Sequence, residues 1–229
     1  AGIPAERIVA VPNGVDVARF DIRDSRADCR SRTRLPPDRP VVGYVGNFRN
    51  TMGMEKGVAC LVSAFAELVK RPGRSNELLV CVGGPEDCLD EYRKLAFENQ
   101  LDEGSVWFPG YVNRADVPYW LRACDVLLIP WPMNEWAAYQ TSPIKLFEYM
   151  ASGTPIVATD LPSLRVVLEP GRNALLAKPG DISSLADAIE TVLDDPDGAR
   201  LRAAEALRDV ASYAWAARAR QVLAGLAPA

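Results

Sequence analysis

Residues 141–155 carry the strongest chemical signal in the sequence. Ser142 is a good N-cap residue, and Pro143 suits the first position of a helix, where its missing N–H costs nothing. Because Gly153 suits the C-terminal cap, we predict a short helix over residues 143–151. The start of such a helix presents free N–H groups and the positive end of the helix dipole, which together can bind a phosphate group.

Two charged residues within this predicted helix indicate what would bind there. Lys145 falls in the first turn, where a cation is unfavourable for the helix dipole unless an anion lies nearby. Glu148 follows one turn later among apolar residues, and a carboxylate on a largely buried helix needs hydrogen-bond donors. Sugar hydroxyls would supply those donors. The alternative is a Lys145–Glu148 ion pair on the surface of an ordinary helix.

A second candidate is the loop over residues 46–57, which is rich in glycine and amides. Such a backbone can approach a ligand closely, and Arg49 and Lys56 could hold a diphosphate. The loop contains neither a P-loop nor a G-x-G-x-x-G pattern, which disfavours an ATPase or a dinucleotide-dependent dehydrogenase. The alternative is a flexible surface loop without a ligand.

The scaffold for these residues is predicted from a regular alternation of short apolar runs and amphipathic segments. Strands are predicted over residues 41–48, 78–82, 106–112, 126–130, 155–159 and 174–177. Helices are predicted over residues 57–70, 86–101, 117–123, 143–151 and 183–193, from 197 onward, and as one short helix within 20–38. Since the strands are apolar on both faces, we predict the α/β class: a Rossmann-like parallel sheet of about six strands with helices on both faces.

This fold class places the ligand site beyond the carboxyl ends of the strands, at a topological switch point. The candidate loops are therefore those that follow the predicted strands: residues 47–56, 83–86, 111–114, 131–142 and 160–165.

Length and composition limit the remaining choices. The 229 residues predict one large domain, with an entry segment or interdomain linker over residues 1–38 and the Rossmann-like domain over residues 39–229. A net charge of −4 disfavours nucleic-acid binding. The absence of histidine excludes histidine-based triads and most metal sites, and we predict no bound metal. Five cysteines without C-x-x-C spacing predict a reducing compartment. No apolar run approaches the length of a membrane span.

The start of the chain predicts a fragment of a longer protein. The first residue is not methionine, and nothing near it resembles a signal peptide.

Several segments together resemble the C-terminal, nucleotide-sugar-binding domain of a retaining GT-B glycosyltransferase of family four. The resemblance covers essentially the whole chain, and the order and spacing of its motifs make it specific. The segments that carry it are residues 11–20 (VPNGVDVARF), 42–46 (VGYVG), 55–57 (EKG), 82–86 (VGGPE), 108–112 (FPGYV), 142–151 (SPIKLFEYMA), 179–181 (PGD) and 213–215 (YAW).

The resemblance implies a role for each matching residue. Glu148 corresponds to the glutamate that holds the ribose 2′- and 3′-hydroxyls, and Lys56 corresponds to the lysine on the diphosphate. Tyr111 and Val112 correspond to the strand end whose backbone pairs with the base. The backbone at the donor phosphate and sugar corresponds to Ser142, Pro143, Ile144 and Lys145.

Two positions depart from the commoner family pattern. The family often has a further glutamate that holds the donor sugar, and Gln140 stands there in this chain. The family's arginine after the first strand falls at Asn47, next to Gly46, and Arg49 is a candidate replacement from two residues further on.

The resemblance also implies a mechanism and partners. Lys56, Arg49 and Glu148 form the predicted catalytic set, in which cations and the helix dipole stabilise a departing nucleoside diphosphate. The donor would be a UDP- or GDP-linked sugar, with no cofactor. A glycan, lipid or small-molecule acceptor would enter through an N-terminal domain that this sequence lacks, so we expect the chain alone to bind donor and transfer little or nothing.

Two alternative functions stay open. One is a non-catalytic module that senses a sugar nucleotide, which Gln140 and the length of the chain support. The other is a GT-B sugar-nucleotide epimerase, which the missing histidine disfavours. We predict a cytoplasmic location and leave contact with the inner membrane face open.

Overall fold

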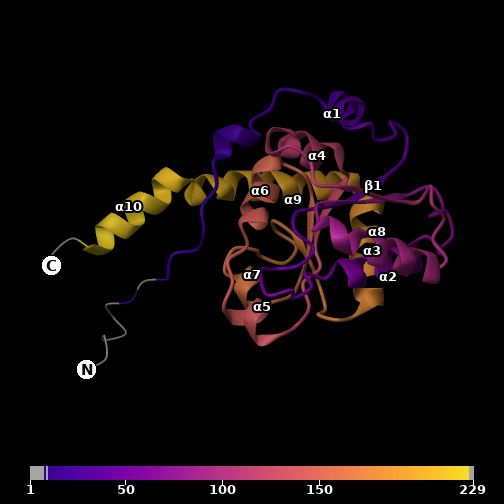
Figure 1. Ribbon diagram of the computed structural model, residues 1–229. Helices are drawn as coiled ribbons and strands as arrows, with labels where there is room; N and C mark the ends of the chain where they lie inside the picture. Colours follow the sequence, from indigo (N-terminus) through magenta and orange to yellow (C-terminus); the bar gives the residue numbers. More distant parts are fainter. Residues whose placement is uncertain (1–7, 9, 227–229) are drawn as a thin grey trace.

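The computed structural model describes residue 8 and residues 10–226 of the chain. Within them, parallel strands form one sheet in the order β3-β2-β1-β4-β5-β6 (Figure 1). The strands are β1 (Val41–Val45), β2 (Leu78–Val82), β3 (Val106–Gly110), β4 (Val126–Ile129), β5 (Ile156–Thr159) and β6 (Leu175–Ala177). The predicted fold class is confirmed. Since the chain reverses its direction of growth after β3, the topological switch point lies between β1 and β4.

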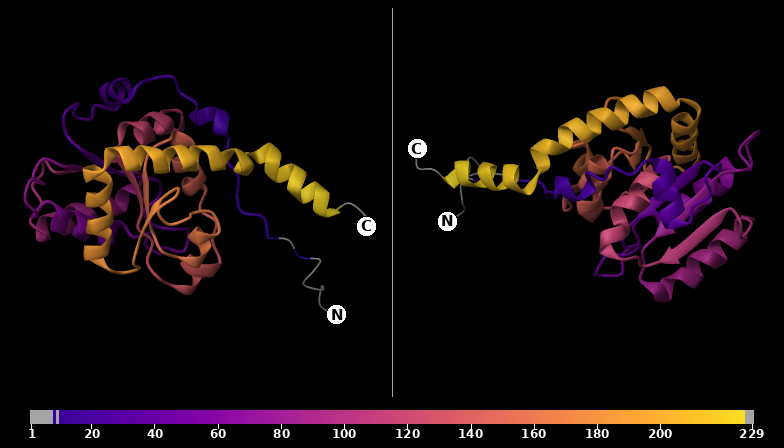
Figure 2. Two further views of the ribbon diagram at one scale, coloured as in Figure 1. Left: turned by 180° about the vertical axis from the view of Figure 1, so that it is seen from behind. Right: turned by 90° about the horizontal axis from the view of Figure 1, so that it is seen from above.

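Helices cover both faces of this sheet, which explains why its central strands are apolar throughout (Figure 2). Along β1, Val41 and Val45 belong to one buried apolar cluster, whereas Val42 and Tyr44 belong to a second cluster on the other face. The first cluster includes residues of α4 (Val117–Ala123) and α6 (Ile144–Ser152), and the second includes residues of α2 (Val58–Leu68), α3 (Leu89–Glu98) and α8 (Ile182–Asp194).

The helix predicted over residues 143–151 is observed as α6, but its start differs from the prediction. Pro143 is the N-cap residue, and Ser142 lies outside the helix. The Ser142 hydroxyl is already engaged, because it accepts a hydrogen bond from the Asn13 backbone N–H at 2.9 Å. The C-terminal cap at Gly153 is confirmed, with a left-handed φ of 67°.

Other boundaries also differ from the predictions. The strand predicted to reach residue 48 ends at Val45, because Gly46 has a φ of 140° and the Phe48 side chain turns into the second cluster. The helix predicted over residues 86–101 begins as a 3-10 turn, Glu86–Cys88, before α3. The structure also contains two short helices that were not predicted, α5 (Glu135–Tyr139) and α7 (Pro162–Arg165).

The segment before the sheet contains the one short helix that was predicted there. This helix, α1 (Arg26–Thr33), begins with a capping box in which Ser25 and Asp28 exchange hydrogen bonds. Cys29 and Leu35 are buried in the first cluster, so this segment packs against the sheet-covering helices.

The last described part of the chain is helical, with one break. After α9 (Pro196–Asp209) a 3-10 turn, Val210–Tyr213, leads into α10 (Trp215–Leu226), which projects from the body of the molecule (Figure 2). The chain before α1 meets the start of α10, where the Arg218 guanidinium donates two hydrogen bonds to the Pro12 carbonyl, at 2.9 and 2.8 Å.

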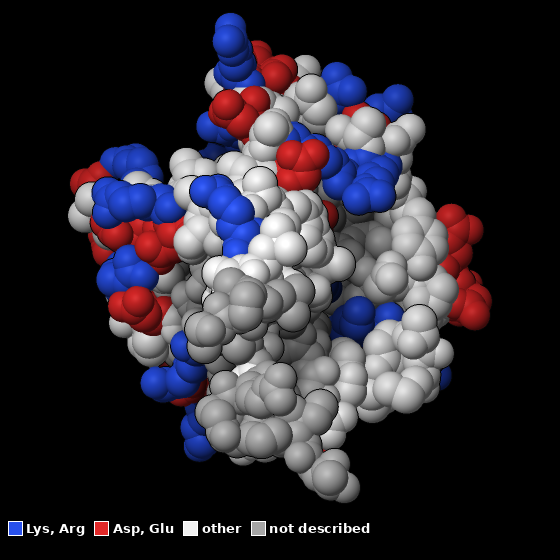
Figure 3. All heavy atoms as spheres, turned by 90° about the vertical axis from the view of Figure 1, so that its left-hand side faces the viewer, with Lys and Arg blue, Asp and Glu red and all other residues white. Residues whose placement is uncertain are grey.

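On the side of the molecule from which α10 projects, charged side chains of both signs lie around a centre of uncharged residues (Figure 3). A hollow lies on this side, and basic side chains lie above and below it. Among the described residues, no helix combines the length and apolarity that a membrane span requires.

Candidate functional site

Lys145 and Gly46 meet at the switch point between β1 and β4. The Lys145 side chain extends from the first turn of α6 toward the end of β1. A Cβ added to Gly46 would lie 2.9 Å from Lys145 Nζ, so a larger residue at this position would displace the amine. The φ of 140° at Gly46 also favours glycine.

Tyr44 is the polar partner of Lys145. The residue Lys145 is 8% exposed, and its amine donates a hydrogen bond to the Tyr44 hydroxyl and lies 3.8 Å from the centre of the Tyr44 ring. Burial lowers the pKa of Lys145 well below its ordinary value, and the charge of Lys56 lowers it further. The site therefore disfavours a charged Lys145 as long as no anion is present.

Glu148 lies one turn further along α6 and is half-buried. Its carboxylate Oε1 lies 3.9 Å from Nη1 of Arg19. Burial raises the pKa of Glu148, whereas the charges of Arg19, Arg114 and Lys145 oppose this rise. The carboxylate is therefore partly shielded from solvent and has one cation beside it.

The loop over residues 46–57 has a defined path. The Asn50 side-chain oxygen accepts hydrogen bonds from Met52 N–H at 2.9 Å and Met54 N–H at 2.8 Å. The Glu55 carboxylate accepts from Gly57 N–H at 2.5 Å and from Ala59 N–H at 3.0 Å, which ties the loop to the start of α2.

The two cations of this loop have different surroundings. Lys56 is half-buried, burial lowers its pKa, and its charge acts on Lys145. The Arg49 guanidinium instead forms an ion pair with Glu91 of α3. The structure therefore brings Lys56, Lys145 and Glu148 together and places Arg49 toward α3.

The remaining predicted residues of the α6 side surround the start of that helix. Pro143 is buried and Ile144 is exposed. Gln140 is exposed at the end of α5, where its backbone N–H donates to the Trp136 carbonyl at 3.0 Å. Ser142 is held by Asn13.

On the β1 and β3 side, the predicted residues follow the strand ends. Asn47 is exposed, and its carbonyl accepts a hydrogen bond from the Tyr44 hydroxyl at 2.7 Å. Tyr111 and Val112 directly follow β3. The Tyr111 ring packs beside Gly84, where an added Cβ would lie 2.8 Å from the ring.

Comparison with known proteins identifies the family. Residues 39–195 match the model of the family described as glycosyl transferases group 1. The chain belongs to this family. It is 32% identical to a D-inositol 3-phosphate glycosyltransferase of Nocardia farcinica, over 97% of this chain and 48% of that protein. It is 30% identical to an alpha-D-kanosaminyltransferase of Streptomyces kanamyceticus, over 86% of this chain and 48% of that protein.

Solved structures agree with this assignment to the glycosyltransferases. Sucrose-phosphate synthase from Thermosynechococcus elongatus is 28% identical with a TM-score of 0.73, over 93% of this chain and 50% of that chain. The Anabaena protein HepE, in complex with UDP and glucose, has the same fold at 23% identity and a TM-score of 0.79, over 98% of this chain and 58% of that chain. This glycosyltransferase domain spans about half the length of the curated relatives it matches.

Two arginines beside this candidate site have no role predicted from the sequence. Arg19 belongs to the early motif over residues 11–20, and Arg114 follows β3 by four residues. The Arg19 guanidinium donates to the Arg114 carbonyl, which joins the two segments beside Glu148. The position of Arg19 within the early motif was the available signal, but only the fold shows that this motif reaches α6.

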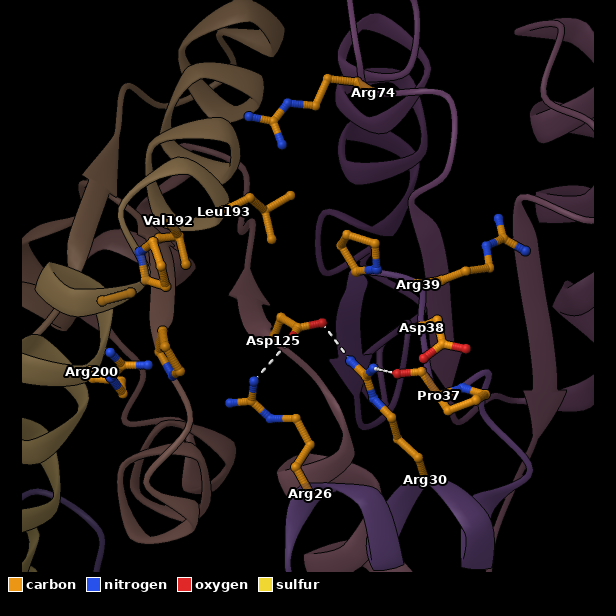
Figure 4. A pocket seen from close by; sticks show the side chains of 14 residues that line it. Arg26, Arg30, Pro37, Asp38, Arg39, Arg74, Asp125, Val192, Leu193 and Arg200 are labelled. Atoms are coloured by element: carbon orange, nitrogen blue, oxygen red, sulfur yellow. Dashed lines mark hydrogen bonds and ion pairs between the residues drawn. The ribbon is translucent and has the colours of Figure 1, made fainter.

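A separate pocket of about 350 Å³ lies at the amino ends of the strands, lined by residues such as Pro40, Asp125 and Pro155 (Figure 4). Arg26 and Arg30 converge on the Asp125 carboxylate, at 2.7 and 2.6 Å. None of the predicted site residues lines this pocket. Its arginines are already engaged, because Arg39 donates to backbone carbonyls and the others form ion pairs with carboxylates. We therefore place the candidate site at the other end of the sheet.

Proposed function

We propose that this glycosyltransferase domain binds a nucleoside diphosphate sugar and contributes the donor half of a retaining glycosyl transfer. The observation that carries the proposal is the convergence of Lys56, Lys145 and Glu148 at the switch point between β1 and β4. Two amines suit a diphosphate, and a half-buried carboxylate beside them suits the hydroxyls of a ribose.

The relatives support a sugar nucleotide as the donor. The curated relatives carry the names of glycosyltransferases, and the Anabaena protein of the same fold was crystallised with UDP-glucose. We therefore favour a UDP-linked sugar as the first donor to test, with a GDP-linked sugar as the second.

The proposed mechanism rests on stabilisation of the leaving group. Negative charge develops on the diphosphate as the bond to the sugar breaks, and fixed positive groups lower the energy of that state. Lys56, Lys145 and the N–H groups at the start of α6 would supply this stabilisation without a metal ion. Glu148 would hold the ribose and so fix the diphosphate in register with these groups. Retention means that the new bond forms on the face of the sugar from which the diphosphate leaves.

The acceptor and the complete reaction belong to the whole protein. Because the domain spans about half of its curated relatives, we propose that a second domain binds the acceptor and that the chain alone binds donor with little or no transfer. Full transferase activity of the isolated chain would contradict this part of the proposal. A cytoplasmic location stays a prediction.

Thermal unfolding with UDP, GDP, ADP and their sugar conjugates tests the donor site. A ligand at one hundred times its Kd stabilises the folded state by about 2.7 kcal/mol, which is readily measured. We expect one base to stabilise selectively, and we expect Glu148→Ala to remove this effect while the domain still unfolds cooperatively. Stabilisation by no nucleotide, or equal stabilisation of the variant, would contradict the site.

Gln140 supports a second candidate, a module that binds the sugar nucleotide without transfer. Its exposed amide stands where a donor-sugar carboxylate would be expected from the family pattern. A protein with both domains that binds the donor tightly but turns over no acceptor would favour this function.

A further inference from the structure

The Lys145 amine has only part of the hydrogen bonding that a charged lysine requires. A protonated amine carries three N–H donors. The one acceptor found for it among the described residues is the Tyr44 hydroxyl. That hydroxyl donates its own proton to the Asn47 carbonyl at 2.7 Å, so it can only accept from Lys145. A charged Lys145 would leave two donors buried without a partner, which is costly.

The nearby carboxylates do not neutralise this amine. In the part of the chain that the structure describes, no ion pair involves Lys145. Glu55 accepts from the N–H groups of Gly57 and Ala59 at the start of α2. Glu148 has Arg19 as its ion-pair partner.

The other groups that face Lys145 do not supply a negative charge either. Besides the carboxylates of Glu148 and Glu55, whose charges raise the pKa of the amine by less than burial and Lys56 lower it, these groups are Tyr44 from β1, Lys56 from the loop after β1 and Cys81 from β2. Lys56 repels a second positive charge, and burial raises the pKa of the Cys81 thiol so that it stays neutral. Burial lowers the pKa of Lys145 itself, in agreement with the hydrogen-bond count.

We propose that Lys145 is uncharged in the free domain and takes up one proton from solution when its amine binds an oxygen of a diphosphate. This inference rests on the donor site proposed above. A diphosphate would supply the negative charge and the acceptor oxygens that the two remaining N–H groups need. The position of Lys145 in the first turn of α6 fits, because the helix dipole there repels a cation alone but attracts an anion.

Calorimetric titration with UDP and with GDP tests this proton uptake. The titrations are made at about pH 8, where the phosphate, with a second pKa near 6, is already ionised. Two buffers of different ionisation enthalpy are compared, because only a reaction that takes up protons gives a buffer-dependent heat. We expect uptake of up to about one proton by the wild-type domain, none by Lys145→Met and the wild-type value for Lys94→Met, which alters an exposed lysine on α3.

Affinity gives a second readout for the same variants. A charge-assisted hydrogen bond predicts a loss of about ten- to a hundredfold in the affinity of Lys145→Met for UDP or GDP. We expect little change for uridine or guanosine, which lack the diphosphate. A purely structural role for Lys145 would change nucleoside and nucleotide affinities alike.

The outcomes separate this inference from the proposed function. Binding of UDP or GDP by the wild-type domain without proton uptake would overturn the inference and leave the donor site intact, whether or not Lys145→Met folds. Equal uptake by wild type and a folded Lys145→Met would do the same. Binding of neither nucleotide would overturn both proposals.

Discussion

Asn13 and Ser142 are 129 positions apart in the chain, yet they are joined by two hydrogen bonds. The Asn13 backbone N–H donates to the Ser142 hydroxyl at 2.9 Å, and the Asn13 side-chain amide donates to the Ser142 carbonyl at 2.5 Å. These bonds hold the segment before the sheet against the start of α6. Since Arg19 lies in the same segment and approaches Glu148, this junction helps to position the charges around the candidate site.

Replacing Asn13 tests the junction. We expect Asn13→Ala to lower the free energy of unfolding by about 1 kcal/mol, because the Ser142 carbonyl loses its partner. Urea unfolding measures this change. Asn76→Ala is the matched control, since Asn76 is exposed in the loop before β2. Equal effects of the two substitutions would show that the hydrogen bond of the Asn13 side chain contributes nothing to stability.

Gly57 joins the loop after β1 to the loop after β4. Its φ is 86°, and an added Cβ would overlap the Pro130 carbonyl oxygen. Gly53, in the same loop, has a similar φ of 78° but open space around its Cα. Alanine substitutions at the two glycines can therefore be compared to separate the cost of backbone strain from the cost of steric overlap.

We expect Gly53→Ala to destabilise the domain by about 1–2 kcal/mol, the cost of a left-handed alanine. Gly57→Ala should cost about 1–3 kcal/mol more, because the packing of Pro130 must also yield. Thermal or urea unfolding of both variants measures the difference. A Gly57→Ala variant no less stable than Gly53→Ala would mean that the loop after β1 does not pack tightly against the loop after β4.

The sheet could be predicted because each strand is a short apolar run between turn residues. Val41–Val45 and Leu78–Val82 are buried along their whole length, so the sequence shows continuous apolar runs there. The helices α5 and α7 contain only five and four residues, which is too short for a helical period to appear. Their positions depend on tertiary packing.

The candidate site could be predicted in part, since residue type and spacing within one segment identify Lys145 and Glu148. The contacts that join distant segments could not be predicted. A local pattern makes Ser142 a helix cap, but a residue 129 positions away uses its hydroxyl instead. Arg49 was assigned to the diphosphate from its place in the loop, and only the fold shows that Glu91 lies within its reach.

The pH dependence of stability reports on Lys145. Burial lowers its pKa in the folded state below the ordinary value of 10.5, so the unfolded chain binds more protons in the window below 10.5. The contribution of this group to stability therefore rises with pH across that window. We expect Lys145→Met to flatten this rise and to be at least as stable as wild type at neutral pH. Thermal unfolding across the window measures both effects, with Lys94→Met as the control.

The pH dependence of nucleotide binding reports on Glu148. Burial raises its pKa above 4.5 in the free domain, and only the ionised carboxylate accepts hydrogen bonds at both oxygens. We expect the affinity for UDP to fall, as pH decreases, at a higher pH than an ordinary carboxyl group would give. Glu148→Gln should lack this step. Because both proteins bind the same ligand, the difference between their profiles removes the ionisation of the phosphate itself. Parallel profiles would contradict a ribose contact by Glu148.

We expect opposite effects on UDP affinity from substitutions of Lys56 and Arg49, although the sequence places both residues at the diphosphate. Lys56 faces Lys145, so Lys56→Met should weaken UDP binding by about tenfold or more and uridine binding much less. Arg49 pairs with Glu91 near the surface, where an ion pair contributes about 0–1 kcal/mol. Arg49→Met should therefore change UDP affinity by no more than about fivefold.

Calorimetric titration of the two variants with UDP and uridine decides between these roles. A third variant, Glu91→Gln, is compared with these two, because it breaks the ion pair and leaves the Arg49 guanidinium in place. If Arg49 stays on α3 when the donor binds, Glu91→Gln and Arg49→Met both bind UDP as the wild-type domain does. If Arg49→Met instead loses as much affinity as Lys56→Met while Glu91→Gln gains affinity, Arg49 leaves Glu91 for the diphosphate. The Glu91 carboxylate would then compete with the donor for the same guanidinium.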